Sequence, residues 1–192
     1  MDEAGRGCLA GPVVAAAVIM CAPNKRRLFR DSKLVPEPRR EEFYEMIIAK
    51  HQWSVGIASV EEIDAINILQ ASLLAMKRAV QGLGVKCGHI LVDGKFTIPD
   101  LRGFSQTPLI KGDMRAENIS AASIIAKVTR DRIMRELGKE FPKYGFAIHK
   151  GYGTRRHRRA LEKVGACQHH RLTFSGVLPE DALGTDPVGT GA

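Results

Sequence analysis

The longest uninterrupted apolar segment of the chain runs from Val13 to Met20, between Gly11-Pro12 and Pro23-Asn24. Its eight residues fall well short of the ~20 needed for a membrane-spanning helix. The segment is rich in valine and alanine and is bounded by turn residues, which favours a strand buried on both faces. Such a strand needs other elements packed against each side, so it restricts the chain to a layered fold.

Strands and helices alternate along the chain as far as Pro142. Apolar residues at helical spacing predict helices over residues 37–50, 64–84 and 117–138, with Asp64 or Asn67 as the cap of the second. Alternating or short continuous apolar residues predict strands at 53–58, 90–92 and 109–110. A loop rich in glycine and aromatic residues follows, and then a basic helix at 154–164. This order predicts an α/β fold with helices packed on a partly parallel sheet.

The composition narrows the class of protein further. The 192 residues are 44% hydrophobic and 26% charged, which excludes a disordered acidic chain and a collagen-like one and suits one domain with at most a small appendage. Lys and Arg number 29 and Asp and Glu 21, so the net charge is +8. This excess suits a polyanionic partner, without choosing between nucleic acid, an acidic protein and a membrane surface.

The chain carries the marks of a cytoplasmic protein. Asp2 and Glu3 stand where a signal peptide has a basic region. The cysteines form no CxxC pair, which argues against a zinc site or a disulfide framework. They are Cys8, Cys21, Cys87 and Cys167. We therefore expect reduced thiols and a cytoplasmic location.

Two carboxylates stand at the ends of predicted strands. Asp93 directly follows the strand at 90–92, and Asp113 follows the one at 109–110. Ligands of open α/β sheets bind beyond the carboxyl ends of the strands, so both positions favour function. For Asp113 the structural alternative is a turn or cap residue of the next helix.

A third acidic position is the pair Asp2-Glu3, followed by Gly5-Arg6-Gly7. Neighbouring residues on a strand point to opposite faces, so both carboxylates reach one point only if the strand ends or bulges there. The glycines permit such an ending. Taken alone, an acidic pair beside glycines is more often a solvated turn.

One sheet would bring Asp2, Glu3, Asp93 and Asp113 to the same place. Oxygen ligands without a His or Cys cluster suit Mg²⁺ or Mn²⁺. Four close carboxylates also need a cation to offset their repulsion. Two such ions can activate a water and stabilise the leaving oxygen of a phosphodiester. The pattern therefore predicts a two-metal nuclease, in keeping with the basic net charge.

Seven short segments of the chain form an ordered series. They are DEAGRG at 2–7, DSK at 31–33, NIL at 67–69, VDG at 92–94, KGD at 111–113, SAASIIAKVTRD at 120–131 and HKGYGT at 149–154. In this order they resemble the successive motifs of the ribonuclease HII family, the type 2 ribonucleases H. The resemblance spans residues 2 to about 175. It implies a ribonuclease H-like mixed sheet flanked by helices, with a small C-terminal helical region.

The resemblance implies a metal-dependent endoribonuclease. Such an enzyme hydrolyses the RNA strand of RNA/DNA hybrids and cuts 5′ of single ribonucleotides embedded in duplex DNA, leaving 3′-hydroxyl and 5′-phosphate ends. It further implies that two divalent ions, Mg²⁺ or Mn²⁺, are held by Asp2, Glu3, Asp93 and Asp113.

Substrate-binding residues follow from the same resemblance. Gly5, Arg6 and Gly7 match the loop that senses the ribose 2′-hydroxyl, the group that distinguishes RNA from DNA. Tyr152 matches a tyrosine that packs on the next deoxyribose. Ser32 and Lys33 lie in a loop suited to a neighbouring phosphate. The structural alternatives are a partly buried loop aromatic for Tyr152 and a solvated side chain for Lys33.

Beyond the core, the expected helix at 154–164 carries a run of arginines suited to the duplex backbone, although a solvated charged face is nearly as good an interpretation. The run is Arg155, Arg156, Arg158 and Arg159, with His157 among them. We expect a catalytic core at 1–140, a substrate-binding helical region at 141–178 and a flexible tail at 179–192. His149 is expected either to be structural or to support the residues of the site from behind, and the neighbours His169 and His170 are not expected to share a metal.

The series departs from the family pattern at its start. In relatives the acidic pair lies within the first strand, after several apolar residues, whereas only Met1 precedes Asp2 here. An α-amino group, with a pKa of about 7.7–8, also stands one residue from an expected ligand and would oppose a cation. We expect added upstream strand residues to raise thermal stability and metal affinity.

Two other hypotheses remain at this point. One is a non-catalytic nucleic-acid-binding protein on the same fold. The other is the related ribonuclease HIII, which carries an extra N-terminal domain, although Gly5-Arg6-Gly7 fits the HII pattern better. We expect a monomer with no membrane partner, and no motif indicates a partner such as a sliding clamp.

Overall fold

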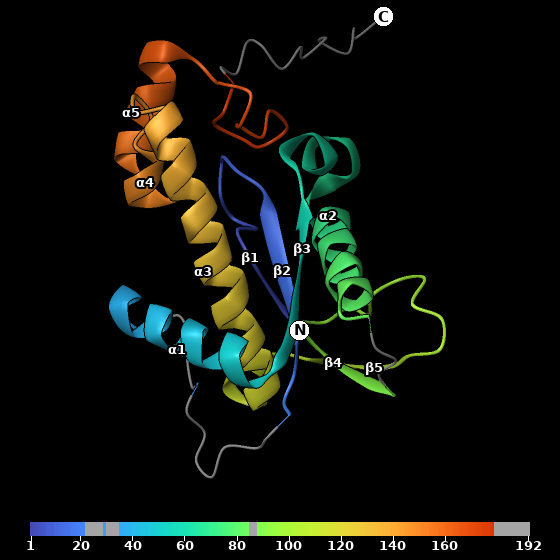
Figure 1. The fold of residues 1–192 in the computed structure, drawn as a ribbon. Helices are drawn as coiled ribbons and strands as arrows, with labels where there is room; N and C mark the ends of the chain where they lie inside the picture. The colour runs from blue at the N-terminus through green and yellow to red at the C-terminus, as the bar shows by residue number, and fades with distance from the viewer. Residues whose placement is uncertain (22–28, 30–34, 85–87, 179–192) are drawn as a thin grey trace, which may run out of the picture.

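The computed structural model describes residues 1–21, 29, 35–84 and 88–178 (Figure 1). Ser32, Lys33 and the expected tail at 179–192 lie outside the described residues. The elements are β1 (Asp2–Ala4), β2 (Val13–Ile19), α1 (Glu37–Lys50), β3 (Gln52–Ala58), α2 (Val60–Gly82), β4 (His89–Asp93), β5 (Ser105–Leu109), the 3-10 helix η1 (Gly112–Met114), α3 (Glu117–Glu140), α4 (Phe146–His149) and α5 (Arg155–Val164).

The strands make a mixed arrangement, as predicted. β1, β2 and β3 pair antiparallel in that order, and β4 pairs parallel with β5. Met1 joins the two groups, because its amino group donates to Leu91 O at 2.8 Å and its carbonyl accepts from Asp93 N at 3.0 Å. The short β1 therefore lies beside β4 and carries the acidic pair to the end of that strand.

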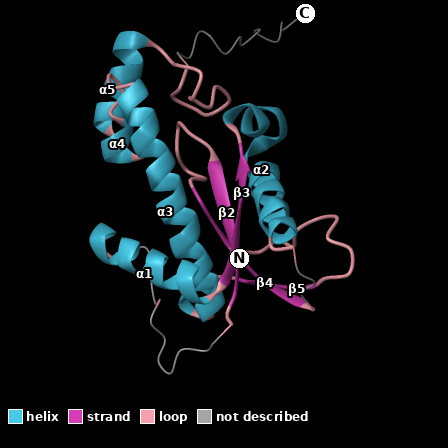
Figure 2. Ribbon diagram, viewed as in Figure 1, coloured by secondary structure: helices cyan, strands magenta, loops and turns pink. Residues whose placement is uncertain are grey.

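Helices cover both faces of the sheet, with α2 on one side and α1 and α3 on the other (Figure 2). Alternate residues of β2 enter the two cores: Val13, Ala15 and Ala17 pack toward α2, whereas Ala16 and Val18 pack toward α1 and α3. The prediction that this strand is buried on both faces is confirmed.

The burial of β3 runs against its hydrophobic pattern. Gly56 and Ala58 are buried, whereas Trp53 and Ile57 are 38% and 40% exposed. A Cβ at Gly56 would lie 2.0 Å from the carbonyl oxygen of Ala75 in α2. The close approach of that helix therefore selects small residues on the inner face of the strand, and the larger side chains take the outer face.

α2 begins before the predicted start. Ser59 and Glu62 form a capping box, so the helix starts at Val60. Asn67 then interrupts it with φ 66°, and its side-chain oxygen accepts from Leu69 N and Gln70 N. The predicted cap at Asn67 thus exists, but inside a kinked helix, where it restarts the helical hydrogen bonding.

Further corrections concern β5 and α4. The strand expected at 109–110 lies at Ser105–Leu109, and Phe146–His149 forms a short helix where only a loop was predicted. The predicted α3 and α5 are confirmed, with Thr154 as the cap of α5. α4 and α5 gather at the far end of α3 (Figure 1). No helix in the described part of the chain is both long and apolar enough to cross a lipid bilayer.

Candidate active site

The acidic pair lies at the exit of β1. The strand ends at Ala4, and Gly5 takes φ 100°, a conformation that favours glycine. Asp2 and Glu3 both line one cavity of about 400 Å³, together with Gly5 and Tyr152. The expectation that an ending strand lets both carboxylates reach one place is therefore confirmed.

Asp93 lines the same cavity from the end of β4. Its Oδ1 accepts a hydrogen bond from Gly112 N at 2.7 Å. A Cβ at Gly112 would lie 3.2 Å from that oxygen and 2.6 Å from Ile119 Cδ1, so this close approach needs glycine. The segment that carries Asp113 is thereby attached to Asp93.

Asp113 itself lies in η1 and is 6% exposed. Its Oδ1 accepts from Met114 N at 3.0 Å. The residue lies in the turn just before α3 but does not cap that helix, whose N-cap is Ala116, so of the structural alternatives the turn is confirmed and the cap is wrong. Asp113 is not among the residues that line the cavity of Asp2, Glu3 and Asp93. The structure thus brings three of the four predicted carboxylates to one cavity and places the fourth next to the Asp93 contact.

The acidic pair is buried without full compensation. Asp2 Oδ2 and Glu3 Oε2 are buried and have no hydrogen-bond partner among the described residues. Burial raises the pKa of Asp2 well above its usual range, and the charges of Glu3 and Asp93 raise it further, against a hydrogen bond from Ser123. Burial likewise raises the pKa of Glu3, while Arg6 lowers it.

These features fit a divalent cation. Two buried carboxylate oxygens without partners, beside a third carboxylate, form the donor set that a hard cation stabilises. As the side chains stand, the described residues contain no group of three or more His, Cys, Asp or Glu arranged to hold a metal ion. The side chains therefore have the oxygen donors that a divalent cation prefers, but they are not yet arranged around a single metal position.

Cationic and aromatic side chains form the other wall of the cavity, where they suit a phosphate-sugar backbone. Arg6 donates to Glu3 Oε1 at 3.2 Å and is 47% exposed. Lys127 lies with its Nζ 5.8 Å from the centre of the Tyr152 ring and pairs with Asp131 at 2.7 Å. Tyr152 is 45% exposed.

Several residues that support this wall were missed as functional. Ser123 and Lys127 fall in a segment that resembles a family motif, so their neighbourhood was flagged, whereas Arg40 had no signal; all three line the cavity. Arg130 lies under Gly5, where a Cβ would come 2.0 Å from its Nε. Arg171 reaches the same loop from the far end of the chain, and nothing in the sequence marks that contact.

The histidines are structural, as expected for His149. His157 Nε2 lies 3.0 Å from His170 Nε2, and His149 stacks on His157 at 4.4 Å. His169 packs edge-on against Phe141 instead. His169 and His170 therefore pack in separate surroundings.

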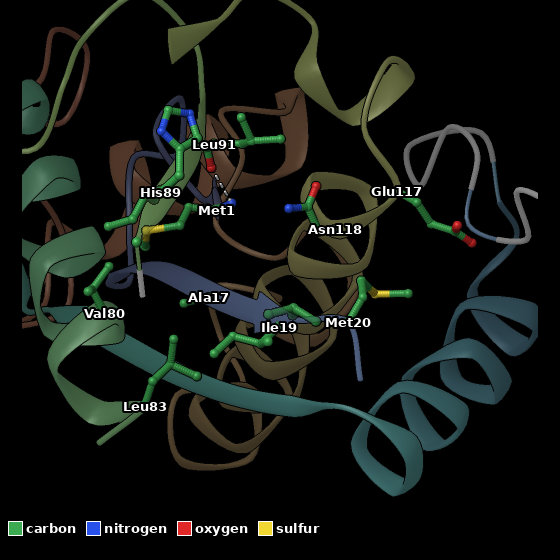
Figure 3. Close-up of a pocket in the computed structure, with 13 residues that line it drawn as sticks. Met1, Ala17, Ile19, Met20, Val80, Leu83, His89, Leu91, Glu117 and Asn118 are labelled. Atoms are coloured by element: carbon green, nitrogen blue, oxygen red, sulfur yellow. Dashed lines mark hydrogen bonds between the residues drawn. The ribbon is translucent and has the colours of Figure 1, made fainter. Parts of the chain in front are cut away.

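A separate cavity of about 610 Å³ begins at Met1 and contains none of the four carboxylates (Figure 3). It lies between the end of β2, the end of α2 and the start of β4, with Ile19, Leu83 and His89 among its lining. Burial lowers the pKa of the Met1 amino group to about 6. Its positive charge is therefore smaller at neutral pH than the sequence predicted.

Comparison with known proteins gives a consistent result. A family model described as Ribonuclease HII matches residues 1–177. The chain is 47% identical over 177 residues to Ribonuclease HII of Pelagibacter ubique, which covers 92% of this chain and 95% of the relative. It is 53% identical over 178 residues to Ribonuclease HII of Delftia acidovorans, covering 92% and 75%. The fold matches a chain in the structure of the PCNA:RNase HII complex from Archaeoglobus fulgidus, with a TM-score of 0.76 at 28% identity. The match covers 89% of this chain and 90% of that chain, and it confirms the predicted ribonuclease H-like fold.

Proposed function

Because the chain belongs to the ribonuclease HII family, we propose that it hydrolyses the RNA strand of RNA/DNA hybrids and cuts 5′ of single ribonucleotides in duplex DNA. The observation that carries this function is the family match over residues 1–177, together with the cavity that Asp2, Glu3 and Asp93 line. The same match, together with curated relatives described as Ribonuclease HII, favours this family over the related ribonuclease HIII.

Asp2, Glu3, Asp93 and Asp113 would hold divalent metal, with Mg²⁺ or Mn²⁺ as the ions and two of them expected during catalysis. When bound, such ions supply an activated water and charge stabilisation at the leaving oxygen, which gives 3′-hydroxyl and 5′-phosphate ends. The unsatisfied oxygens of Asp2 and Glu3 support this assignment. Ser123 orients Asp2 through its hydrogen bond.

The remaining residues of the cavity bind and orient the substrate. Arg6 and Lys127 attract the phosphates on either side of the scissile one. Gly5, Arg6 and Gly7 bring backbone groups close to the ribose, since neither glycine has a side chain in the way. The exposed ring of Tyr152 packs on the following deoxyribose. Ser32 and Lys33 are further proposed phosphate contacts.

The division of labour along the chain is a related proposal. Residues 1–140 would carry the chemistry, and 141–178 would extend the contact with duplex through the arginines of α5. We further propose that the protein acts as a monomer in the cytoplasm. The relative from Archaeoglobus fulgidus was solved as a complex with PCNA. A sliding-clamp partner for this chain is therefore a hypothesis to test by co-purification.

The deciding experiment uses a DNA duplex with one embedded ribonucleotide and an all-DNA duplex of the same sequence, each incubated with Mg²⁺, Mn²⁺ or EDTA. We expect a single cut 5′ of the ribonucleotide with either metal and none with EDTA. Asp93→Asn should abolish cutting and leave duplex binding nearly unchanged. Binding by the wild-type chain without any metal-dependent cut would contradict the proposal and favour a non-catalytic binding protein.

A further inference from the structure

Arg171 is the side chain that ties the C-terminal segment to the loop after β1. Its side chain is completely buried, although its hydrogen-bond partners lie 160 to 166 residues away in the sequence. Arg171 Nη2 donates to Gly5 O at 2.7 Å, and Nη1 donates to Arg6 O at 2.9 Å. Nε and Nη2 also donate to Gly11 O, at 3.0 and 2.8 Å. One guanidinium thus binds both ends of the loop.

The backbone reinforces this contact. Arg171 N donates to Leu9 O at 2.9 Å, and Gly11 N donates to His169 O at 2.8 Å. The guanidinium lies over the ring of Phe174 at 5.0 Å. The orientation of the guanidinium is therefore fixed from both sides of the loop and from its own segment.

Burying this cation carries a cost. Burial lowers the pKa of Arg171 to about 10, and the neighbouring Arg130 lowers it further. Within the described part of the chain, the guanidinium donates its hydrogen bonds to backbone carbonyl oxygens, so the charge is compensated by backbone dipoles. A buried polar network of this kind fixes a conformation when every donor is satisfied.

The consequence for the loop follows from the planarity of the peptide bond. In a trans peptide the C=O of one residue and the N–H of the next point in opposite directions. Because Arg171 holds the carbonyls of Gly5 and Arg6, the amides of Arg6 and Gly7 point away from it. Neither amide has a hydrogen-bond partner within the described part of the chain. Gly5, Arg6 and Gly7 line the cavity of the carboxylates.

We propose that Arg171 is a positioning residue for substrate selection: it fixes the two peptide planes so that the Arg6 and Gly7 amides meet the ribose 2′-hydroxyl. The inference rests on the proposed function of the loop. Arg171 touches neither substrate nor metal in this scheme. It acts by preventing the loop from turning its carbonyls toward the sugar.

The test measures how well the protein distinguishes a ribonucleotide from a deoxyribonucleotide, and not its activity alone. Two duplexes that differ in one 2′-hydroxyl are bound to the full-length protein in EDTA, and the ratio of their Kd values is determined. We expect Arg171→Met to reduce the wild-type preference for the ribonucleotide duplex about tenfold, the size of one lost hydrogen bond to a polar group. Arg171→Lys should fall between the two, since an ammonium keeps the charge but not the fork of donors.

The matched control is Arg132→Met. Arg132 also lies over an aromatic ring, Tyr44 at 4.3 Å, and bonds to carboxylates at 2.6 and 3.2 Å, but these partners belong to α1 and not to the loop. Its loss should leave the Kd ratio unchanged. A purely structural loss of active protein lowers the amplitude of binding to both duplexes equally and does not move this ratio.

If circular dichroism shows that Arg171→Met does not fold, Phe174→Leu decides, because it removes only the ring over the guanidinium. We expect it to lower the ratio about two- to threefold. A folded Arg171→Met, or failing that Phe174→Leu, with the wild-type ratio would overturn the inference. A wild-type protein that neither cuts nor prefers the ribonucleotide duplex would instead refute the proposed function.

Discussion

The two sides of the loop after β1 are built on opposite electrostatic principles. On the cavity side, Asp2 is buried and Glu3 is partly buried, and each has one buried carboxylate oxygen without a hydrogen-bond partner among the described residues. On the C-terminal side, Arg171 and His170 are buried just as deeply, and their ring or guanidinium nitrogens are all hydrogen bonded. One region holds unsatisfied charge, and the other holds satisfied polar groups.

This difference separates binding from support. A buried group that is fully hydrogen bonded stabilises one conformation and has nothing left to offer a ligand. A buried carboxylate oxygen without a partner costs folding free energy until a cation arrives. The cavity side therefore has the properties of a site, and the C-terminal side has those of its scaffold.

The largest effect is expected for Asp2→Asn. Cleavage should fall by about a thousandfold or more, because a proposed metal ligand is lost. In EDTA the same variant should be more stable than wild type by about 1 kcal/mol, or roughly 2–4 °C in melting temperature, because a buried carboxylate with a raised pKa has gone. Differential scanning calorimetry and the single-ribonucleotide assay measure both effects.

Saturating Mg²⁺ provides the control for Asp2→Asn. The wild-type melting temperature should rise with the metal, since binding to the folded state stabilises it by mass action, and that of Asp2→Asn should rise less. An Asp2→Asn protein that melts below wild type in EDTA would show that the carboxylate stabilises the fold, and the contrast between the two regions would be wrong.

The sequence predicted the carboxylates that line the cavity better than it predicted the buried residues that hold the loop from the C-terminal side. Asp93 stands at the end of a short apolar strand, and the position of such carboxylates follows from local pattern and sheet geometry. Arg171 bonds to backbone carbonyls near the start of the chain, and carbonyls leave no signature in a sequence. The outer face of β3 was missed for a similar reason, because the approach of Ala75 to Gly56 depends on helix packing.

A second prediction concerns the loss of folding stability at low pH. Three buried histidines have lowered pKa values, chiefly through burial, and that of His170 falls to about 4. His157 Nδ1 faces Tyr152 O at 2.9 Å and His170 Nδ1 accepts from Cys167 N, so the neutral rings share a single proton between their Nε2 atoms. A further proton would set two N–H groups against each other across 3.0 Å.

The direction in which stability changes with pH follows from the difference between the folded and unfolded pKa values of these histidines. The unfolded histidines protonate near pH 6.5, and the folded ones resist, so the stability they contribute is present above pH 6.5 and is lost as the pH falls toward 4. The cationic neighbours Arg156, Lys150 and Arg158 act in the same direction. Asp2 acts in the opposite direction, since protonation relieves its repulsion as the pH falls.

Melting temperatures between pH 8 and pH 4.5 measure this balance. We expect wild type to lose several degrees below pH 6.5, and His170→Asn, which keeps an acceptor for Cys167 N, to lose fewer. The control is His89→Asn, at the exposed first residue of β4, which should follow wild type. Parallel curves for His170→Asn and wild type would show that the buried histidines do not govern the acid response.

The smallest effect is expected at the cavity of about 610 Å³ beside Met1, where neither region's principle applies because most of the lining residues are apolar. Three apolar residues added before Met1 would continue β1 between β2 and β4. Burial contributes about 1.5–3 kcal/mol per apolar side chain, while ordering costs ~1–2 kcal/mol of backbone entropy and about 0.5–1 kcal/mol of side-chain entropy per residue, so the terms nearly cancel. We expect a net gain of roughly 1 kcal/mol for the three residues together, or about 2–4 °C. A Gly-Ser-Gly extension is the control, and equal melting temperatures for the two extensions would contradict the prediction.

Both extensions also move the amino group away from Asp2, so apparent Mg²⁺ affinity should rise most below pH 6, where that group is charged.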